Sequence, residues 1–348
     1  AVQYDMIMKT FKGKYKYANT IAICLEDSIG DEGEDCAIEN VRKIFSEIRK
    51  INSKSNLEFS KILSDKNFEY QEKKNRIQYE QIENQAKYKN DKMIFVRIKD
   101  IGQMLKIKDI IVDNSEIITA IVLPKSNQEL IENILDILNS WNLSSMSVIP
   151  IIESKEFLYP ELKEESFLKL QNTIIKNKER ILSIRIGTTD ILGIFGTRRS
   201  DSLTLYENDI CANFIKDVVL YLNRDEIDIP ISGGVSELFD MKDEKIRKLF
   251  MREIKLDKLN GLFGKTVIHP MQIPIVQSMC CVTYHDYKDA LQIVNQNEGI
   301  YGVCKSSSGQ KMNEAKPHLK WAKKILKISD IYGVLNEGIE NEILQNKF

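Results

Sequence analysis

Carboxylate residues follow two successive apolar segments of the chain, at the point where each segment ends. Glu153 comes directly after SVIPII, and Asp190 comes three residues after ILSIRIG. Carboxylate oxygens are ligands that Mg²⁺ prefers, and one or two of them suffice because the ion keeps several of its waters. The pair therefore predicts a Mg²⁺ site, with Mn²⁺ as the alternative ion, that would polarise a substrate carbonyl and stabilise an enolate.

Other apolar segments carry or precede further charged residues. Glu26 and Asp27 follow TIAICL, Arg97 lies within MIFVRI, and Lys125 follows ITAIVLP. Arg97 is suited to grip a carboxylate through two hydrogen bonds, or to lie against an enolate oxygen. Taken singly, an acid after a strand is also explained as a helix cap or a first-turn charge, and Asp27 and Asp190 are most open to that alternative. The convergence of several segment ends favours a shared site.

Seven short apolar segments, each followed by a helical pattern, predict βα units and a parallel sheet. They span residues 20–25, 93–98, 118–124, 147–152, 181–187, 228–234 and 261–270. In a TIM-type (β/α)₈ barrel the active site lies at the carboxyl ends of the strands, which is where the charged residues fall, so this α/β barrel is the predicted fold. The missing first strand is expected to precede Ala1, because residues 5–14 have a helical pattern. A doubly wound open sheet is the alternative, but no G-x-G-x-x-G follows the first segment.

The barrel is expected to span residues 1–283, with an appendage of helices at 284–348. Residues 50–92 are rich in Lys, Glu, Asn and Gln with spaced apolar residues, which predicts a helical insertion. Its mixed charges indicate a solvated surface, with partner binding as the alternative. Arg198 and Arg199 lie in a Gly- and Ser-containing loop, where we expect solvated side chains, although they are also able to grip an anion.

The charges of the chain balance, because 50 Lys and Arg residues face 51 Asp and Glu residues, for a net charge of −1. No overall field therefore draws the protein to nucleic acid or to an anionic membrane. No apolar stretch approaches the roughly 18 to 20 residues that span a bilayer, and the first twenty residues lack the apolar core of a signal peptide. The sequence predicts a cytoplasmic protein that binds a small-molecule acid and neither nucleic acid nor membrane.

Other catalytic patterns are missing from the sequence. The three histidines form no H-x-x-x-H or H-E-x-x-H pair, and no G-x-S-x-G occurs. The six cysteines form no C-x₂-C spacing, which indicates structural thiols in a reducing compartment. Catalysis is therefore expected to rest on a metal and on electrostatics.

Six motifs occur in a fixed order: ICLEDS, FVRI, VLPKS, IPIIES, RIGTTDIL and GKTVIHPMQI. In this order and spacing they resemble the HpcH/HpaI aldolase and citrate lyase β-subunit superfamily, from residue 11 onward. The strings GTTDILGIFGTRRS and KMNEAKPHLKWAKKIL are most similar to the branch called C–C bond lyases of the TIM-barrel fold, often encoded near stress- or tellurite-resistance genes. The resemblance implies metal-dependent retro-aldol or retro-Claisen cleavage of a β-hydroxy acid or its thioester, or the reverse condensation.

By motif position, the resemblance implies roles for the residues already named. Glu153 and Asp190 would be the Mg²⁺ ligands, and Arg97 would bind the substrate carboxylate or the enolate. Glu26 and Asp27 would order the waters on the metal. A coenzyme A thioester as the substrate is a further implication, which no independent motif supports.

The resemblance also implies roles for residues outside the carboxylate pair. Lys125 would be an electrostatic neighbour of the site, and Lys265 and His269 would close the pocket floor or bind a ligand anion. Some relatives insert a catalytic aspartate, in a Met-x-Asp context, from a neighbouring subunit. Glu314 holds that position here in Met-Asn-Glu, which implies a homo-oligomer, with a trimer and a hexamer as alternatives; an ordinary helix-start residue is the competing interpretation.

Two other classes of function stay open at this point. A phosphoenolpyruvate-type mutase or phosphoryl-transfer enzyme would also stabilise an enolate with Mg²⁺ on the same barrel, and the fold alone does not separate the two. A barrel kept as a non-catalytic scaffold or sensor is the third hypothesis. The set of carboxylates at segment ends argues against it.

Overall fold

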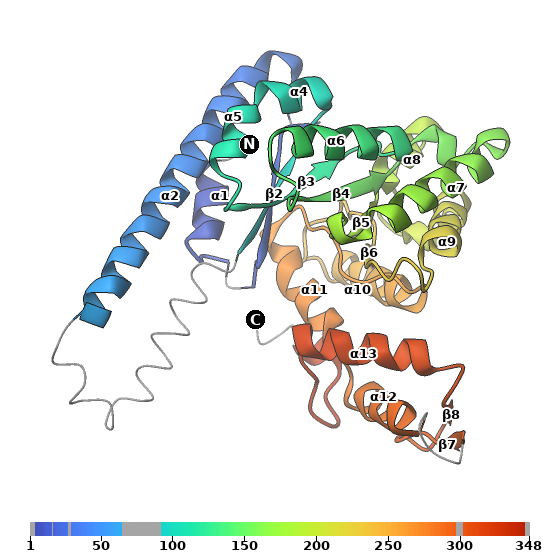
Figure 1. Cartoon of the computed structure of the whole chain (residues 1–348). Coiled ribbons are helices and arrows are strands. Elements are labelled where there is room, and N and C mark those ends of the chain that lie inside the picture. The colour runs from blue at the N-terminus through green and yellow to red at the C-terminus, as the bar shows by residue number, and fades with distance from the viewer. Residues whose placement is uncertain (1–3, 16, 27–28, 65–91, 297–301, 345–348) are drawn as a thin grey trace. The chain divides into compact units, whose positions relative to one another are not determined.

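A computed structural model of the chain describes residues 4–15, 17–26, 29–64, 92–296 and 302–344 (Figure 1). The chain divides into two compact units. The first unit comprises residues 1–197 and 213–231, and the second comprises residues 198–212 and 232–348.

The strands form one sheet in which the order in space follows the order in sequence. They are β1 Thr20–Cys24, β2 Met93–Arg97, β3 Ile118–Leu123, β4 Ser147–Ile152, β5 Ile184–Ile186 and β6 Ile231–Ser232. Each neighbouring pair from β1 to β5 is parallel. This confirms the predicted α/β class and parallel sheet. The order never reverses, as winding in one direction around a (β/α) barrel requires, whereas a doubly wound sheet reverses at its switch point.

One helix precedes the first strand, and further helices lie between successive parallel strands, as such connections require. Along the sequence they are α1 Tyr4–Phe11, α2 Glu34–Ser64, α4 Ile101–Lys106, α5 Lys108–Asp113, α6 Gln128–Ser140, α7 Pro160–Lys176, α8 Thr188–Ile194 and α9 Asp209–Leu222. Short 3₁₀ helices lie at Asp31–Gly33, Lys155–Phe157, Lys178–Arg180, Leu205–Glu207 and Pro270–Gln272. Figure 1 shows α4, α5 and α6 along one side of β2, β3 and β4.

Local sequence signals explain where these helices begin. Asp100 precedes α4 and its carboxylate accepts a hydrogen bond from the Gln103 N–H, and Asn127 caps α6 in the same way. Pro160 opens α7, a position where its missing N–H costs nothing. The apolar stripe of α6 is buried, including Ile134.

Both faces of the sheet are apolar, which explains the nearly unbroken apolar segments. One face carries a core cluster formed by Phe95, Ala120, Val122, Ile149 and Ile151. Residues of opposite parity, such as Ile23, Val96, Ile121 and Val148, are also fully or almost fully buried. Side chains therefore alternate between two covered faces.

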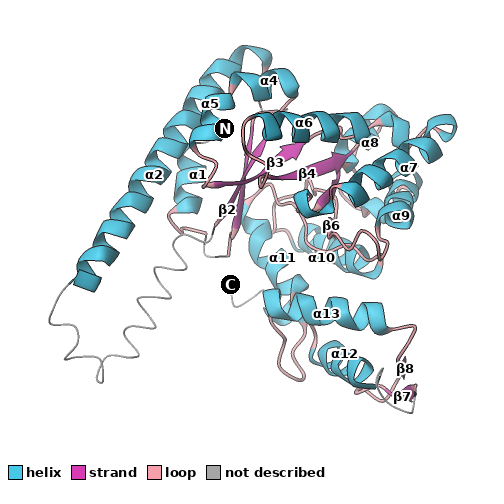
Figure 2. Cartoon of the chain, in the orientation of Figure 1, coloured by secondary structure: helices cyan, strands magenta, loops and turns pink. Residues whose placement is uncertain are grey.

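The second unit is mostly helical. Its elements are α10 Glu244–Leu259, α11 Ile273–Cys280, α12 Tyr284–Gln296, β7 Val303–Lys305, β8 Met312–Glu314, α13 Leu319–Tyr332 and α14 Asn341–Leu344. Apolar residues of α10 and α11 form one core cluster, and those of α12 and α13 form another. The strands β7 and β8 pair as an antiparallel hairpin, so the predicted appendage at 284–348 contains a hairpin besides its helices (Figure 2).

The last two predicted strands are largely wrong. Segment 228–234 keeps only the two residues of β6, and segment 261–270 contributes a single bridge, between Gly233 and Lys265. Pro230 supplies no N–H for a strand ladder, and Gly261 and Gly264 adopt φ of 82° and 72°, which extended strands exclude. In the predicted insertion at 50–92, helix α2 continues to Ser64 and residues 65–91 lie outside the described part of the chain.

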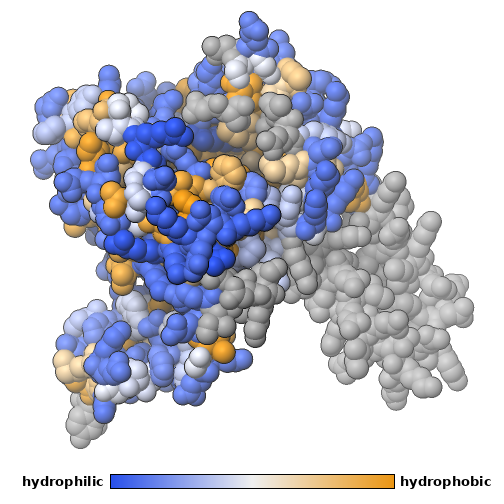
Figure 3. Space-filling model, turned by 180° about the vertical axis from the view of Figure 1, so that it is seen from behind, coloured by the Kyte–Doolittle hydropathy of each residue, from blue (hydrophilic) through white to orange (hydrophobic). Residues whose placement is uncertain are grey.

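Hydrophilic residues predominate on the face drawn in Figure 3, with apolar residues scattered among them. The exposed large apolar residues come from many different elements, among them Leu105, Leu220, Leu259 and Ile331. In the residues that the structure describes, none of the helices combines the length and the apolar character that crossing a bilayer requires.

Candidate active site

Five of the predicted site residues lie at the carboxyl ends of the first five strands. Glu26 follows β1, Arg97 ends β2, Lys125 follows β3, and Glu153 follows β4 directly. Asp190 lies in the first turn of α8, after β5. Because the strands are parallel, these ends share one edge of the sheet, and four ion pairs join all five side chains.

The Glu153 carboxylate is buried, with an exposed fraction of 3%. It lies against the backbone of Gly187, where an added Cβ would approach Glu153 Oε2 to 1.9 Å. Any other residue at position 187 would therefore displace it. The Lys125 N–H donates a 2.9 Å hydrogen bond to Glu153 Oε1, from a residue whose φ of 47° lies in the left-handed region that side chains disfavour.

Arg97 links two of the acids. Its Nη2 lies 3.6 Å from Glu153 Oε1 and also forms an ion pair with Glu26 Oε2. Both acids are almost completely buried, so the pairing offsets the cost of removing their charges from water. Arg97 thereby holds the two carboxylates in fixed positions.

Lys125 connects the remaining acid to this group. Its Nζ lies 3.9 Å from Glu26 Oε1 and 3.9 Å from Asp190 Oδ1. The Lys125 side chain is more than half exposed, so these ion pairs are screened by water and hold it only loosely. It can shift toward a bound anion.

The environment of Glu153 disfavours its charge. Burial raises the pKa of Glu153 to about 7, and the negative charge of Asp190 adds to the rise. The Lys125 N–H and Arg97 act in the opposite direction without cancelling the effect. A further positive charge near Glu153 and Asp190, such as a metal ion, would therefore stabilise their ionised forms.

Arg185, on β5, is a charged neighbour of this site that was not predicted. Burial lowers its pKa to about 10, with a further contribution from the positive charge of Arg97. Glu153 and Glu26 are close enough to act on it in the opposite direction. The signal that was available is a basic residue inside the apolar segment 181–187.

A family model described as "C-C_Bond_Lyase of the TIM-Barrel fold" matches residues 1–334. The chain belongs to this family of C–C bond lyases. The predicted branch is thus confirmed, and with it the coarse assignment to the lyases.

Among solved structures, the crystal structure of RipC from Yersinia pestis matches with a TM-score of 0.45 and 15% sequence identity. That match covers 75% of this chain and 88% of the RipC chain. None of the curated proteins matches this C–C bond lyase chain.

The carboxylates of this C–C bond lyase fit the modest demands of a Mg²⁺ ion. Two acids on adjacent strand ends, one of them with a strongly raised pKa, are a donor set that a hard cation would stabilise. Among the described residues, no group of three or more His, Cys, Asp or Glu side chains is arranged to hold a metal. Water and substrate oxygens would therefore have to supply the other ligands, which is usual for Mg²⁺.

Four other predicted site residues lie outside the described part of the first unit. Asp27 lies outside the described residues, and Lys265, His269 and Glu314 belong to the second unit. His269 accepts a hydrogen bond from the Met271 N–H through Nδ1 at the start of a 3₁₀ helix. The Glu314 N–H, at the end of β8, donates to His318 Nδ1 at 3.0 Å.

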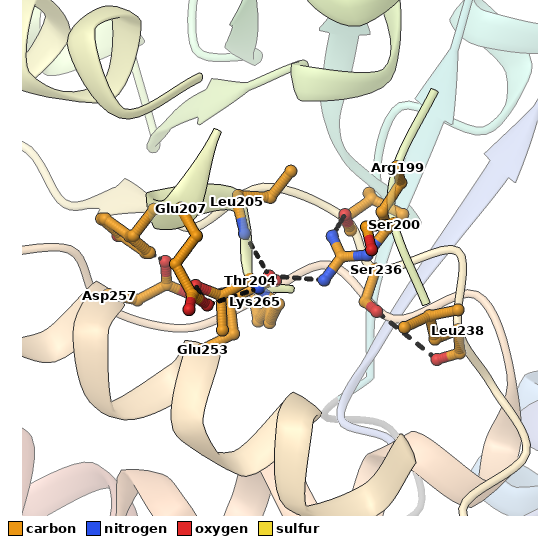
Figure 4. Close-up of polar contacts among 12 residues, drawn as sticks. Arg199, Ser200, Thr204, Leu205, Glu207, Ser236, Leu238, Glu253, Asp257 and Lys265 are labelled. Carbon is orange, nitrogen blue, oxygen red and sulfur yellow. Dashed lines mark hydrogen bonds and ion pairs between the residues drawn. The ribbon is translucent and has the colours of Figure 1, made fainter. Parts of the chain in front are cut away.

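Lys265 lies in a buried network of charges in the second unit (Figure 4). Its Nζ is 2.8 Å from Asp257 Oδ2 and 2.9 Å from Glu253 Oε1, and none of the Lys265 side chain is exposed. Burial alone would lower the pKa of Lys265, but the two carboxylates outweigh it and raise that pKa. Lys265 is thus a charged partner of two acids, and its Nζ is already occupied by them.

The same network corrects the prediction that both adjacent arginines are solvated. Arg198 is exposed, but Arg199 is buried and forms an ion pair with Glu253. Glu253 Oε2 also accepts a hydrogen bond from the Leu205 N–H, and the Tyr206 hydroxyl donates to the Asp257 carboxylate at 2.7 Å. The network fastens residues 198–212 to α10, which explains why this stretch belongs to the second unit.

Proposed function

We propose that this protein is a Mg²⁺-dependent C–C bond lyase that cleaves a β-hydroxy acid or its thioester, or catalyses the reverse condensation. The observation that supports it most strongly is the buried Glu153 carboxylate, whose pKa is raised to about 7 by burial and by the neighbouring Asp190. The negative charges of Glu153 and Asp190 destabilise each other at the edge of the sheet. A cation bound between them would remove this repulsion.

In this proposal Glu153 and Asp190 hold the ion, and Mg²⁺ supplies Lewis-acid stabilisation of negative charge on a substrate oxygen. Arg97 holds Glu26 and Glu153 in place through its two ion pairs. Lys125, loosely held, moves its ammonium group toward developing negative charge on the substrate. Glu26, which pairs with Arg97 and Lys125, orders water at the site.

The test has two stages, of which the first is metal binding. Titration calorimetry with Mg²⁺ is expected to show at least a roughly tenfold weaker affinity for Glu153→Gln and for Asp190→Asn, because each removes a charged ligand. Glu165→Gln is the matched control, since Glu165 pairs only with Lys169 on the exposed side of α7. Unchanged Mg²⁺ affinity in both site variants would remove these residues from the proposed role.

The second stage is the reaction. The wild-type protein is incubated with β-hydroxy acids and their coenzyme A thioesters, with Mg²⁺ or with EDTA, and carbonyl products are measured. Cleavage that needs Mg²⁺ and is lost in Asp190→Asn supports the proposal. Release of inorganic phosphate from phosphoenolpyruvate-type substrates, without C–C cleavage, would assign the site to the mutase or phosphoryl-transfer class instead.

A further inference from the structure

Arg185 and Arg97 project from the same face of the sheet. In paired parallel strands, residues opposite one another point to the same side, and every second residue returns to it. Cys24 pairs with Arg97, Arg97 with Val122, and Ile151 with Arg185. Since Val122 and Ile151 share one core cluster, Arg185 lies at the far end of the face that begins with Arg97.

Arg185 also lies near the backbone on which the Glu153 carboxylate rests. It precedes Gly187 by two residues on the same side of the strand, a rise of roughly 7 Å. The Glu153 carboxylate rests on Gly187, and an extended arginine side chain is long enough to bring its guanidinium to that level. The electrostatic influence of Glu153 and Glu26 on Arg185 agrees with this placement.

The two arginines differ in what holds them. Arg97 is engaged by two carboxylates. In the described part of the chain, Arg185 forms no ion pair within 4 Å and no side-chain hydrogen bond. The Arg185 residue is only partly exposed, and a guanidinium partly withdrawn from water without a protein partner favours a ligand or water that completes its hydrogen bonds.

We propose that Arg185 binds the carboxylate of the substrate, through its two-pronged guanidinium, on the sheet face below Glu153 and beside Ile151. Arg97 is then a positioning residue that fixes Glu26 and Glu153, in place of the substrate-binding role that its sequence position implies. This assignment rests on the proposed function of the same site. It predicts a substrate whose carboxylate points toward this face of the sheet.

The test separates anion binding from metal binding by their opposite response to one substitution. Arg185→Met keeps an unbranched apolar stem but removes the guanidinium and its charge. The Kd of 3-hydroxybutyrate, a simple β-hydroxy acid, is expected to rise roughly 10- to 100-fold, which is the loss of a charge-assisted hydrogen-bonded pair. The Kd of Mg²⁺ is expected to stay the same or to fall, because a nearby positive charge has gone. A misfolded variant would lose both.

Arg185→Lys keeps the positive charge but loses the planar guanidinium that can donate two parallel hydrogen bonds. It is expected to weaken 3-hydroxybutyrate binding by less than Arg185→Met does. Arg198→Gln, at an exposed position, controls for the loss of an arginine charge. Binding is measured by titration calorimetry with EDTA for the acid and without it for Mg²⁺, and inorganic phosphate is titrated as a second anion.

Unchanged 3-hydroxybutyrate affinity in Arg185→Met, absence of binding to the wild type, or parallel loss of acid and Mg²⁺ binding would each overturn the assignment. Tighter binding of phosphate than of the acid, lost in the same variant, would overturn the carboxylate class. If the wild type binds the acid through Arg185 but binds no Mg²⁺, the proposed function fails while the role of Arg185 as an anion site stands.

Discussion

Replacing Glu153 by Gln should stabilise the metal-free protein at alkaline pH, although it removes a ligand of the proposed metal site. The pKa of Glu153 rises from an ordinary value of 4.5 to about 7 on folding. The folded state therefore holds the proton more tightly than the unfolded chain does, so the free energy of unfolding falls as the pH rises from 4.5 to 7. At about 1.36 kcal/mol for each pH unit, the full cost above pH 7 is about 3 kcal/mol.

Gln is neutral at every pH and escapes this cost. It keeps an oxygen for the Lys125 N–H, but its amide group is a poorer partner for Arg97, which offsets the gain by about 1 kcal/mol. At pH 8 we expect the free energy of unfolding of Glu153→Gln to be higher than that of the wild type by about 2 kcal/mol, or roughly 4 to 8 °C in Tm. At pH 5 the gain should vanish, because Glu153 is then protonated in the folded wild type.

The assay is urea unfolding with EDTA at pH 5 and pH 8, followed by tryptophan fluorescence. The chain has two tryptophans, and Trp141 is buried in the same unit as Glu153. A Trp321→Phe background therefore makes Trp141 the reporter for that unit. Adding Mg²⁺ at 100 times the wild-type Kd should stabilise the wild-type protein by about 2.7 kcal/mol, and Glu153→Gln, with its weaker affinity, by no more than about 1.4 kcal/mol.

Glu165→Gln, an exposed substitution of the same chemistry, should leave the unfolding midpoint unchanged at both pH values. Equal destabilisation of Glu153→Gln at pH 5 and pH 8 would show that the charge of Glu153 costs the folded state nothing, which contradicts a pKa raised by burial.

Two further substitutions test the close packing of buried charge. Gly187→Ala places a Cβ within 1.9 Å of the Glu153 carboxylate, so we expect a loss of about 1 to 3 kcal/mol in urea unfolding and weaker Mg²⁺ binding; Gly193→Ala, which meets nothing within 4 Å in helix α8, should be neutral or stabilising. Lys265→Met leaves Glu253 and its neighbouring carboxylate short of one buried positive charge, and the unfolding free energy measured by circular dichroism should fall by about 3 to 5 kcal/mol.

The strands that could be predicted are those whose packing alone decides their structure. The segments that became β1 to β5 are apolar on both faces and contain no residue that interrupts a ladder at their centre, apart from Pro150 in β4. The last two segments have the same apolar character, but Pro230 and the left-handed glycines at 261 and 264 act against extended pairing. In these two segments the apolar residues correctly predicted burial, but they did not correctly predict an extended strand.

The charged residues at the strand ends could be predicted because parallel strands bring their carboxyl ends to one edge. Their individual partners could not. Both Arg97 and Lys265 follow the same rule of position, yet Arg97 lies among the acids of the site and Lys265 is enclosed by Glu253 and Asp257. Those two acids come from α10, four residues apart on its buried side, a signal that a search of strand ends does not examine.

The charges at the proposed metal site indicate the charge of the substrate. In the described residues the group holds three acids and three bases: Glu26, Glu153, Asp190, Arg97, Lys125 and Arg185. With every acid ionised the group is neutral, and a bound Mg²⁺ would leave it with two positive charges in a partly buried setting, where isolated charge is costly. A substrate with one carboxylate lowers this excess to one positive charge, and a neutral substrate leaves it at two. A β-hydroxy acid would place its carboxylate against Arg185 and its hydroxyl oxygen toward the ion held by Glu153 and Asp190. Mg²⁺ and the acid should therefore each bind more tightly in the presence of the other.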